Sequence, residues 1–106
     1  MNAVEEDVKR LVGKELEAAN ERFPQFHSPH EGWAVIREEA DELNDENVCL
    51  DYNLNEYMWE HIKANKGTKE DARMVMVTGI HAACEAIQVA AMARKYLDML
   101  GEEEDE

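Results

Sequence analysis

One stretch of the sequence, residues 74–93, constrains the fold more than any other, because it is apolar on nearly every side of a helix. A helix that is apolar all round usually packs at the centre of a bundle or between subunits. Thr78, His81, Glu85 and Gln88 interrupt the stretch, which is too polar for an ordinary membrane span. It therefore predicts the central helix of an all-α protein.

Helical spacing of apolar residues continues through the rest of the 106-residue chain, and the alternating pattern of strands is absent. The spacing predicts helices in four places, about 3–22, 29–47, a short part of 53–67, and 69–100. We expect an all-α helical bundle with three to four helices per chain.

Local signals mark two helix starts. Ser28 is a good N-cap, Pro29 fits the first helical position, and Glu31 completes a capping box. Gly67 is expected to end one helix and Thr68 to cap the next. The chain is read as one domain over residues 1–100, followed by an acidic tail over residues 101–106.

A chain of this length can bury only a modest core by itself. The long apolar helix has more apolar surface than one copy of the chain should cover. This predicts a homodimer or a homotetramer with its sites near the subunit interface.

The N-terminus lacks the apolar segment of a signal peptide, and Cys49 and Cys84 lack the spacing of a metal site. A cytoplasmic location is expected.

The balance of charge excludes some partners. The chain has 25 acidic and 11 basic residues, a formal net charge of -14. Nucleic acids and anionic membrane surfaces are bound by basic surfaces, so neither is expected here. A protein of this charge that handles a phosphate substrate needs a divalent cation between the two.

Glu85 is the first candidate metal ligand, because it is the only acidic or basic residue within the apolar stretch. An ionised carboxylate inside apolar protein is costly unless a cation meets it. Gln88 lies three residues later, on the same helix face. The alternative is a structural ion pair between Glu85 and an arginine or lysine of another helix.

Glu39 and Glu42 form a second candidate pair, three residues apart on the predicted second helix. A solvated acidic face is the alternative interpretation of this charged run. Packed side by side, the two helices would present several oxygen ligands to one or two cations. Ligation by oxygen alone suits Mg²⁺ or Mn²⁺ better than Zn²⁺.

The segments EADEL at 39–43 and EAIQ at 85–88 resemble the paired ExxEL and ExxD motifs of MazG-like all-α nucleoside triphosphate pyrophosphohydrolases. The surrounding sequence is similar to a short viral and bacterial branch of that superfamily. The resemblance covers residues 26–97 and is poor over residues 46–73. It implies Mg²⁺-dependent cleavage of a nucleoside triphosphate to the monophosphate and pyrophosphate.

The same resemblance implies which residues hold the metal. The matching positions are Glu39, Glu42, Glu85 and Gln88, where the family usually has aspartate at the last. A glutamine offers a carbonyl oxygen to a cation but supplies neither charge nor a base.

Other roles follow from what the hydrolysis requires. Glu38 or Glu39 is the expected catalytic base, and the sequence does not choose between them. Arg94 and Lys95 are candidates for binding the substrate. Trp33 is a candidate residue for the wall of a pocket that holds the base of the nucleotide, although packing in the core would also explain it.

Three alternatives remain. A degenerate bundle of the same type could act as a non-catalytic binding module, for which Gln88 is the main argument. A di-iron bundle is disfavoured, because none of the four histidines has a glutamate three residues before it. The third alternative is an enzyme of the same superfamily with the specificity of a dUTPase or of a phosphoribosyl-ATP pyrophosphatase, and the sequence does not distinguish between these specificities.

Overall fold

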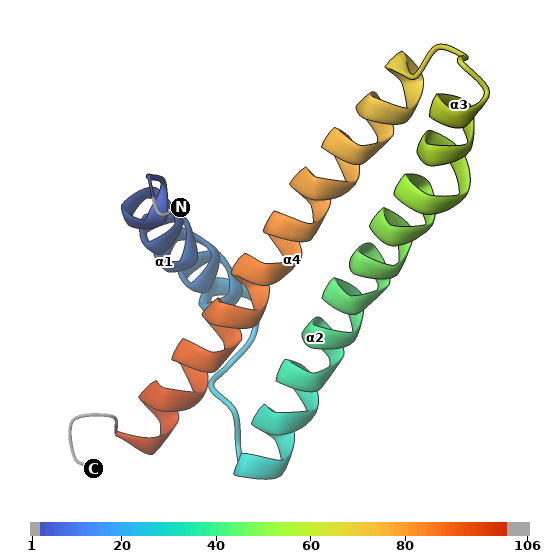
Figure 1. The fold of residues 1–106 in the computed structure, drawn as a ribbon. Helices are drawn as coiled ribbons and strands as arrows, with labels where there is room; N and C mark the ends of the chain where they lie inside the picture. Colours follow the sequence, from blue (N-terminus) through green and yellow to red (C-terminus); the bar gives the residue numbers. More distant parts are fainter. Residues whose placement is uncertain (1–2, 102–106) are drawn as a thin grey trace. The chain divides into compact units, whose positions relative to one another are not determined.

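The computed structural model of the chain describes residues 3–101, and these residues contain helices but no strand. The helices are α1 (Glu5–Arg22), α2 (Pro29–Tyr52), the π-helical segment η1 (Asn53–Met58), α3 (Trp59–Lys63) and α4 (Lys69–Leu100) (Figure 1). The all-α prediction is confirmed. The acidic tail predicted over residues 101–106 lies outside the described residues, except for Gly101.

Contacts within the chain divide it into two compact units. The first unit contains residues up to Ala40 and from Ala86 onward, and so includes α1, the start of α2 and the end of α4. The second unit, Asp41–Glu85, includes the rest of α2, η1, α3 and the start of α4. The single domain expected over residues 1–100 stays a prediction.

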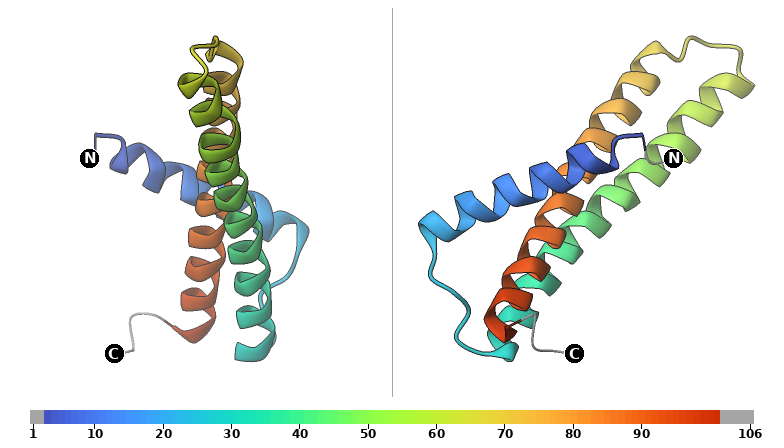
Figure 2. Two further views of the ribbon diagram at one scale, coloured as in Figure 1. Left: turned by 45° about the vertical axis from the view of Figure 1, so that its right-hand side comes forward. Right: turned by 90° about the vertical axis from the view of Figure 1, so that its left-hand side faces the viewer.

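The first unit has a small apolar core. Its buried hydrophobic residues are Phe26, Ala91 and Met92, and α1 packs against them (Figure 2). The α1 residues in this contact are Val12, Leu16 and Ala19. Three further apolar residues toward the N-terminal end of α1, Val4, Val8 and Leu11, are exposed. One copy of the chain therefore covers only half of the apolar face of α1.

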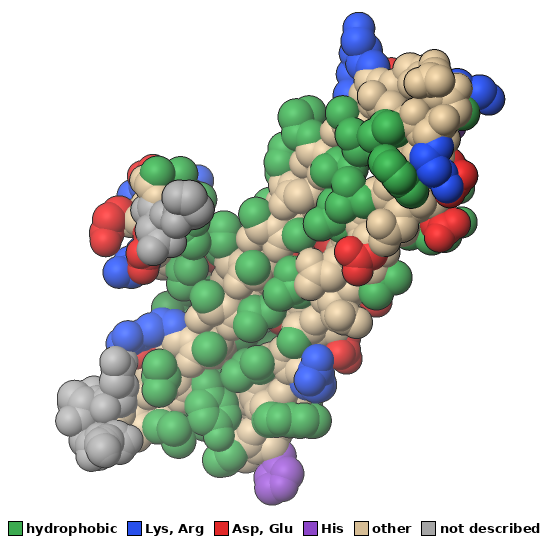
Figure 3. Space-filling view, viewed as in Figure 1, with side chains coloured by type: hydrophobic (Ala, Val, Ile, Leu, Met, Phe, Trp, Pro, Cys, Tyr) green, Lys and Arg blue, Asp and Glu red, His purple; other side chains and the backbone are tan. Residues whose placement is uncertain are grey.

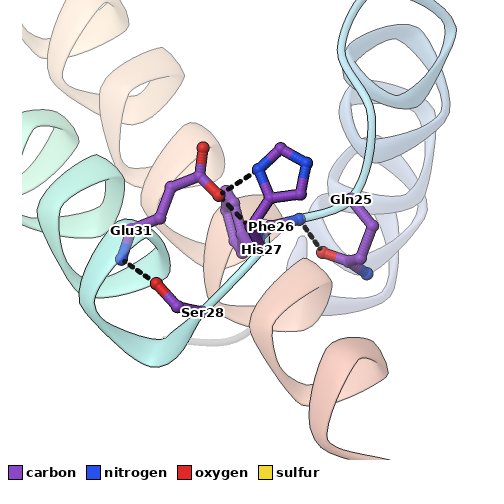
Figure 4. Close-up of polar contacts among 5 residues, drawn as sticks. All are labelled: Gln25, Phe26, His27, Ser28 and Glu31. Atoms are coloured by element: carbon purple, nitrogen blue, oxygen red, sulfur yellow. Dashed lines mark hydrogen bonds and ion pairs between the residues drawn. The ribbon is translucent and has the colours of Figure 1, made fainter.

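The start of α2 is fixed by the capping residues that the sequence predicts (Figure 4). The Glu31 backbone N–H donates to Ser28 Oγ at 3.1 Å. The Glu31 carboxylate accepts from the His27 backbone N–H at 2.5 Å and lies 3.2 Å from His27 Nδ1. These contacts satisfy backbone donors that a helix start leaves without intrahelical partners.

Replacing Ser28 with alanine tests this cap. We expect Ser28→Ala to lower the free energy of unfolding by about 1 kcal/mol, because Glu31 loses its acceptor. Ser28→Asp is the control, since aspartate caps equally well, and it should stay close to wild type. Urea denaturation measures both changes. An equal loss in the two variants would show that the cap contributes little.

In the second unit, the connection between α3 and α4 ends α3 with a Schellman motif. Asn65 adopts a left-handed conformation, with φ of 58°. The Lys66 N–H donates to the His61 carbonyl at 2.9 Å, and the Asn65 N–H donates to the Ile62 carbonyl at 3.0 Å. The sequence predicted the stop at Gly67, whereas the helix ends earlier because asparagine tolerates this conformation.

Helix α4 has the predicted bounds and continues through Gly79 without a break. By length and composition alone it is apolar enough to cross a membrane. Core helices of soluble proteins meet the same criteria. This property does not by itself assign α4 to a membrane.

Large apolar side chains of α4 are exposed in the second unit. Met76 is 59% exposed, and Met74, Val77 and Ile80 are exposed as well. Figure 3 shows hydrophobic side chains gathered over α4. Contiguous exposed apolar residues of this kind mark interaction sites on soluble proteins.

Candidate metal centre

Two acidic side chains come together inside the second unit. Glu42 lies on α2 and Glu85 on α4, and carboxylate oxygens of the two lie within 4.8 Å of each other. They are 43 positions apart in the chain, so the hairpin of α2, η1, α3 and α4 creates this proximity. Two like charges at this distance repel each other strongly unless a cation or a proton lies between them.

Glu85 is the less exposed member of this pair. Its Oε1 atom is buried and has no hydrogen-bond partner among the described residues. Burial raises the pKa of the Glu85 carboxyl group above its usual range, and the charge of Glu42 raises it further. The charge of Glu46 acts in the same direction, while the charge of His81 lowers the pKa.

These surroundings limit what the pair can do. Without a metal, Glu85 holds a proton more readily than an isolated glutamate, because its ionised form is disfavoured. A divalent cation would remove that penalty by neutralising both carboxylates. Carboxylate oxygens are ligands that Mg²⁺ prefers. The pair therefore fits either a shared proton or a hard cation.

Glu39 lies three residues before Glu42 on the continuous helix α2, and it is partly buried. This spacing places both side chains on one side of α2. Glu39 also lines a pocket of about 480 Å³ inside the first unit, together with the exposed Glu38. The two candidates for the catalytic base thus border the same pocket.

The pocket has both polar and apolar walls. Gln88 and Lys95 of α4 line it. Among its apolar lining residues are Phe23, Phe26, Val35 and Met92. Small-molecule sites commonly combine a mostly apolar lining with a few placed polar groups, at volumes of about 300–1,000 Å³.

Two of the predicted substrate-binding residues do not line this pocket. Arg94 is exposed and forms an ion pair with Asp98, with its Nη2 atom 3.0 Å from Asp98 Oδ1. Trp33 is 65% exposed, so the alternative that it packs in the core is wrong for a single copy of the chain. Lys95, the third predicted residue, is 2% exposed.

Sequence reasoning missed an interaction that joins the ends of the hairpin in the second unit. His61 Nδ1 of α3 lies 2.7 Å from Asp71 Oδ2 in the first turn of α4. The Asp71 side chain is only 12% exposed. No spacing signal marks this pair, because the two residues meet only through the loop between the helices.

Comparison with known proteins identifies no relative, since no family model, curated protein or solved structure matches the chain. The resemblance to MazG-like enzymes rests on the two sequence motifs.

Proposed function

We propose that this protein is a Mg²⁺-dependent nucleoside triphosphate pyrophosphohydrolase, for which Mn²⁺ can replace Mg²⁺. The observation that carries the proposal is the proximity of the Glu42 and Glu85 carboxylates within the second unit. The buried Oε1 atom of Glu85 supports it, because a cation would supply the partner that the described residues do not. The resemblance of the two motifs to MazG-like enzymes supplies the reaction.

The resemblance supplies the ligand set of this proposal: its motif positions make Glu39, Glu42 and Glu85 the carboxylate ligands, and Gln88 contributes its amide oxygen. A divalent cation held by these residues would supply charge neutralisation on the phosphates and on the departing pyrophosphate. Three carboxylates and a neutral amide carry less charge than four carboxylates. We therefore expect weaker metal binding than a site with aspartate in place of Gln88 would show.

The pocket residues have the remaining roles. Water attacks the α-phosphorus, the bond from that phosphorus to the bridging oxygen breaks, and pyrophosphate leaves. Glu39 is assigned to the metal, so Glu38 is the pocket carboxylate assigned to orient the water and accept its proton. The apolar walls of the pocket would exclude solvent from the bound nucleotide. Arg94 is left out, because it pairs with Asp98 away from the pocket.

We also propose that the protein is a cytoplasmic homo-oligomer, with a dimer as the basic unit. The exposed apolar side chains of α4 support a second copy as the partner. A strongly acidic chain is poorly suited to an anionic membrane or to nucleic acid.

Light scattering coupled to size exclusion tests the oligomer. We expect a mass of about 24 kDa or its double, against 12.2 kDa for one chain. Met76→Glu places a charge among the exposed apolar residues of α4 and should shift the protein toward monomer. Lys69→Glu, an exposed change at the start of α4, is the control and should not. A wild-type protein that is monomeric at all concentrations would refute the proposal.

Pyrophosphate release from a panel of ribo- and deoxynucleoside triphosphates tests the activity. We expect release of pyrophosphate and monophosphate with Mg²⁺ or Mn²⁺, and none with EDTA. No release from any triphosphate by well-folded protein would instead support the non-catalytic binding module. Gln88→Asp, which restores the residue usual in the family, would then show whether the missing carboxylate explains the loss.

A further inference from the structure

The second unit, Asp41–Glu85, has almost no core of its own. The structure describes every one of its residues, and Thr78 is the only buried one among them, at 4% exposed. The first unit, by contrast, buries Phe26, Ala91 and Met92. Helices in proteins owe most of their stability to the packing of an apolar face. The hairpin of the second unit therefore lacks most of the contacts that would hold its two arms together.

Large apolar side chains on both arms of this hairpin are exposed instead. On the arm formed by α4 they are Met74, Met76, Val77 and Ile80. On the arm formed by α2, η1 and α3 they are Val48, Tyr52, Leu54, Tyr57, Trp59 and Ile62. Side chains of this size present on the order of 100 Å² each when half exposed, and together on the order of 1,000 Å². One partner contributes about 800 Å² to a standard protein interface, so this surface is large enough for a stable dimer.

The charge of the exposed surface fits a second copy of the chain as the partner. Residues 74–84 of α4 include no Lys, Arg, Asp or Glu. A second copy carries the same formal charge of -14, so it associates best where no like charges face each other. The uncharged stretch of α4 meets this condition. Two such hairpins, one from each copy, supply the helices of a four-helix bundle.

We propose that the hairpin closes only against the hairpin of a second copy, so that dimerisation forms the metal centre. This inference rests on the proposed function, because that function assigns Glu42 and Glu85 to the cation. Their carboxylate oxygens lie within 4.8 Å of each other only while α2 and α4 lie side by side. Two like charges at this distance repel each other when neither a cation nor a proton lies between them. Closing the hairpin therefore needs the apolar contacts that a second copy supplies.

This coupling makes the metal affinity depend on protein concentration. A monomer whose hairpin is closed about one-tenth of the time binds the cation about tenfold more weakly than the dimer does. By linkage, each bound cation stabilises the dimer by the same factor. In Mn²⁺ titrations followed by electron paramagnetic resonance, we expect about tenfold weaker binding by dilute, monomeric wild type than by concentrated, dimeric wild type. Met76→Glu should bind as weakly as the dilute protein, although it alters no metal ligand.

Amide hydrogen exchange in EDTA, measured by mass spectrometry, tests the closing of the hairpin without a metal. Residues 41–85 should be protected in concentrated wild type and should lose most of that protection in Met76→Glu. The part of α4 around the buried Ala91 and Met92 should stay protected in both. Lys69→Glu also adds negative charge to α4, but at an exposed position outside the uncharged stretch, and it should exchange as wild type does. A dilution series of wild type makes the same comparison without a substitution.

The outcomes distinguish a failure of this coupling from a failure of the metal centre. A folded monomer that protects residues 41–85 as the dimer does, or that binds Mn²⁺ equally well, would overturn the coupling and leave the metal centre intact. Wild-type protein that stays monomeric at all concentrations would overturn it as well. Protection that depends on dimerisation, in a protein that binds no Mn²⁺, would support closing by a second copy and refute the metal centre.

Discussion

Glu85→Gln should reduce metal-dependent pyrophosphate release by at least about 100-fold while leaving the helical circular dichroism unchanged. Residues that only support metal ligands already change activity by about 10- to 100-fold, and Glu85 is proposed as a ligand itself. Glutamine keeps the size of the side chain but removes its charge. The matched control is Glu17→Gln, the same change at an exposed position of α1, which should retain full activity.

The stability of Glu85→Gln distinguishes a metal site from a structural ion pair. Because the pKa of Glu85 is raised in the folded state, its protonated form contributes stability that is fully present below the unfolded pKa. That contribution is lost as pH rises through the raised folded pKa. In EDTA, the variant should therefore melt above wild type at neutral pH, and the difference should shrink on acidification. Mg²⁺ should raise the melting temperature of wild type only.

Thermal denaturation between about pH 4 and pH 8 measures this pattern, because carboxyl groups with a raised pKa titrate within this range. The measurement is made once in EDTA and once in Mg²⁺. A structural ion pair gives the opposite result. Breaking a buried pair costs about 3–5 kcal/mol, so Glu85→Gln would then melt far below wild type at neutral pH.

Gly32→Ala should lower the free energy of unfolding by about 1–2 kcal/mol. A Cβ atom at this position would lie 2.4 Å from Tyr96 Cδ2 and 3.0 Å from Phe26 Cδ2, so the rings beside the core must shift. Overpacking of this kind costs about 1–3 kcal/mol, and the higher helix propensity of alanine returns up to about 1 kcal/mol. Urea denaturation measures the difference.

Gly13→Ala is the matched control for this substitution. Nothing lies within 4 Å of a Cβ atom added at Gly13, which is exposed within α1. The same change should therefore stabilise the protein by about 1 kcal/mol. If both variants were stabilised, the close packing of Gly32 against Tyr96 would be wrong.

The helices could be predicted from the sequence where local chemistry decides them. Ser28, Pro29 and Glu31 lie next to one another in the chain and fix the start of α2. The end of α3 was predicted less well, because Asn65 and Gly67 both permit a turn and only the structure shows which is used. The second helix also extends beyond residue 47 to Tyr52 and continues through η1 and α3.

The candidate site could be predicted only in part. The isolated Glu85 in an apolar helix and its expected pairing with Glu42 followed from burial cost and helix periodicity. The exposure of Trp33 could not be predicted, because an aromatic residue on an apolar stripe packs equally well in a core or against another copy. Only the structure shows that Lys95 is buried while Arg94 is exposed, because helix periodicity says that the two adjacent side chains point in different directions but not which of them points inward.

Titration with Mn²⁺, followed by electron paramagnetic resonance, tests most directly whether Glu42 and Glu85 hold a divalent cation. Wild-type protein should bind Mn²⁺ in a saturable way that excess Mg²⁺ reverses, and Glu85→Gln and Glu42→Gln should each lose most of that affinity. Glu17→Gln should bind as wild type does. Folded wild-type protein that binds no Mn²⁺, or that binds it equally well after Glu85→Gln, would contradict the metal centre and leave the two carboxyl groups as a pair that shares a proton.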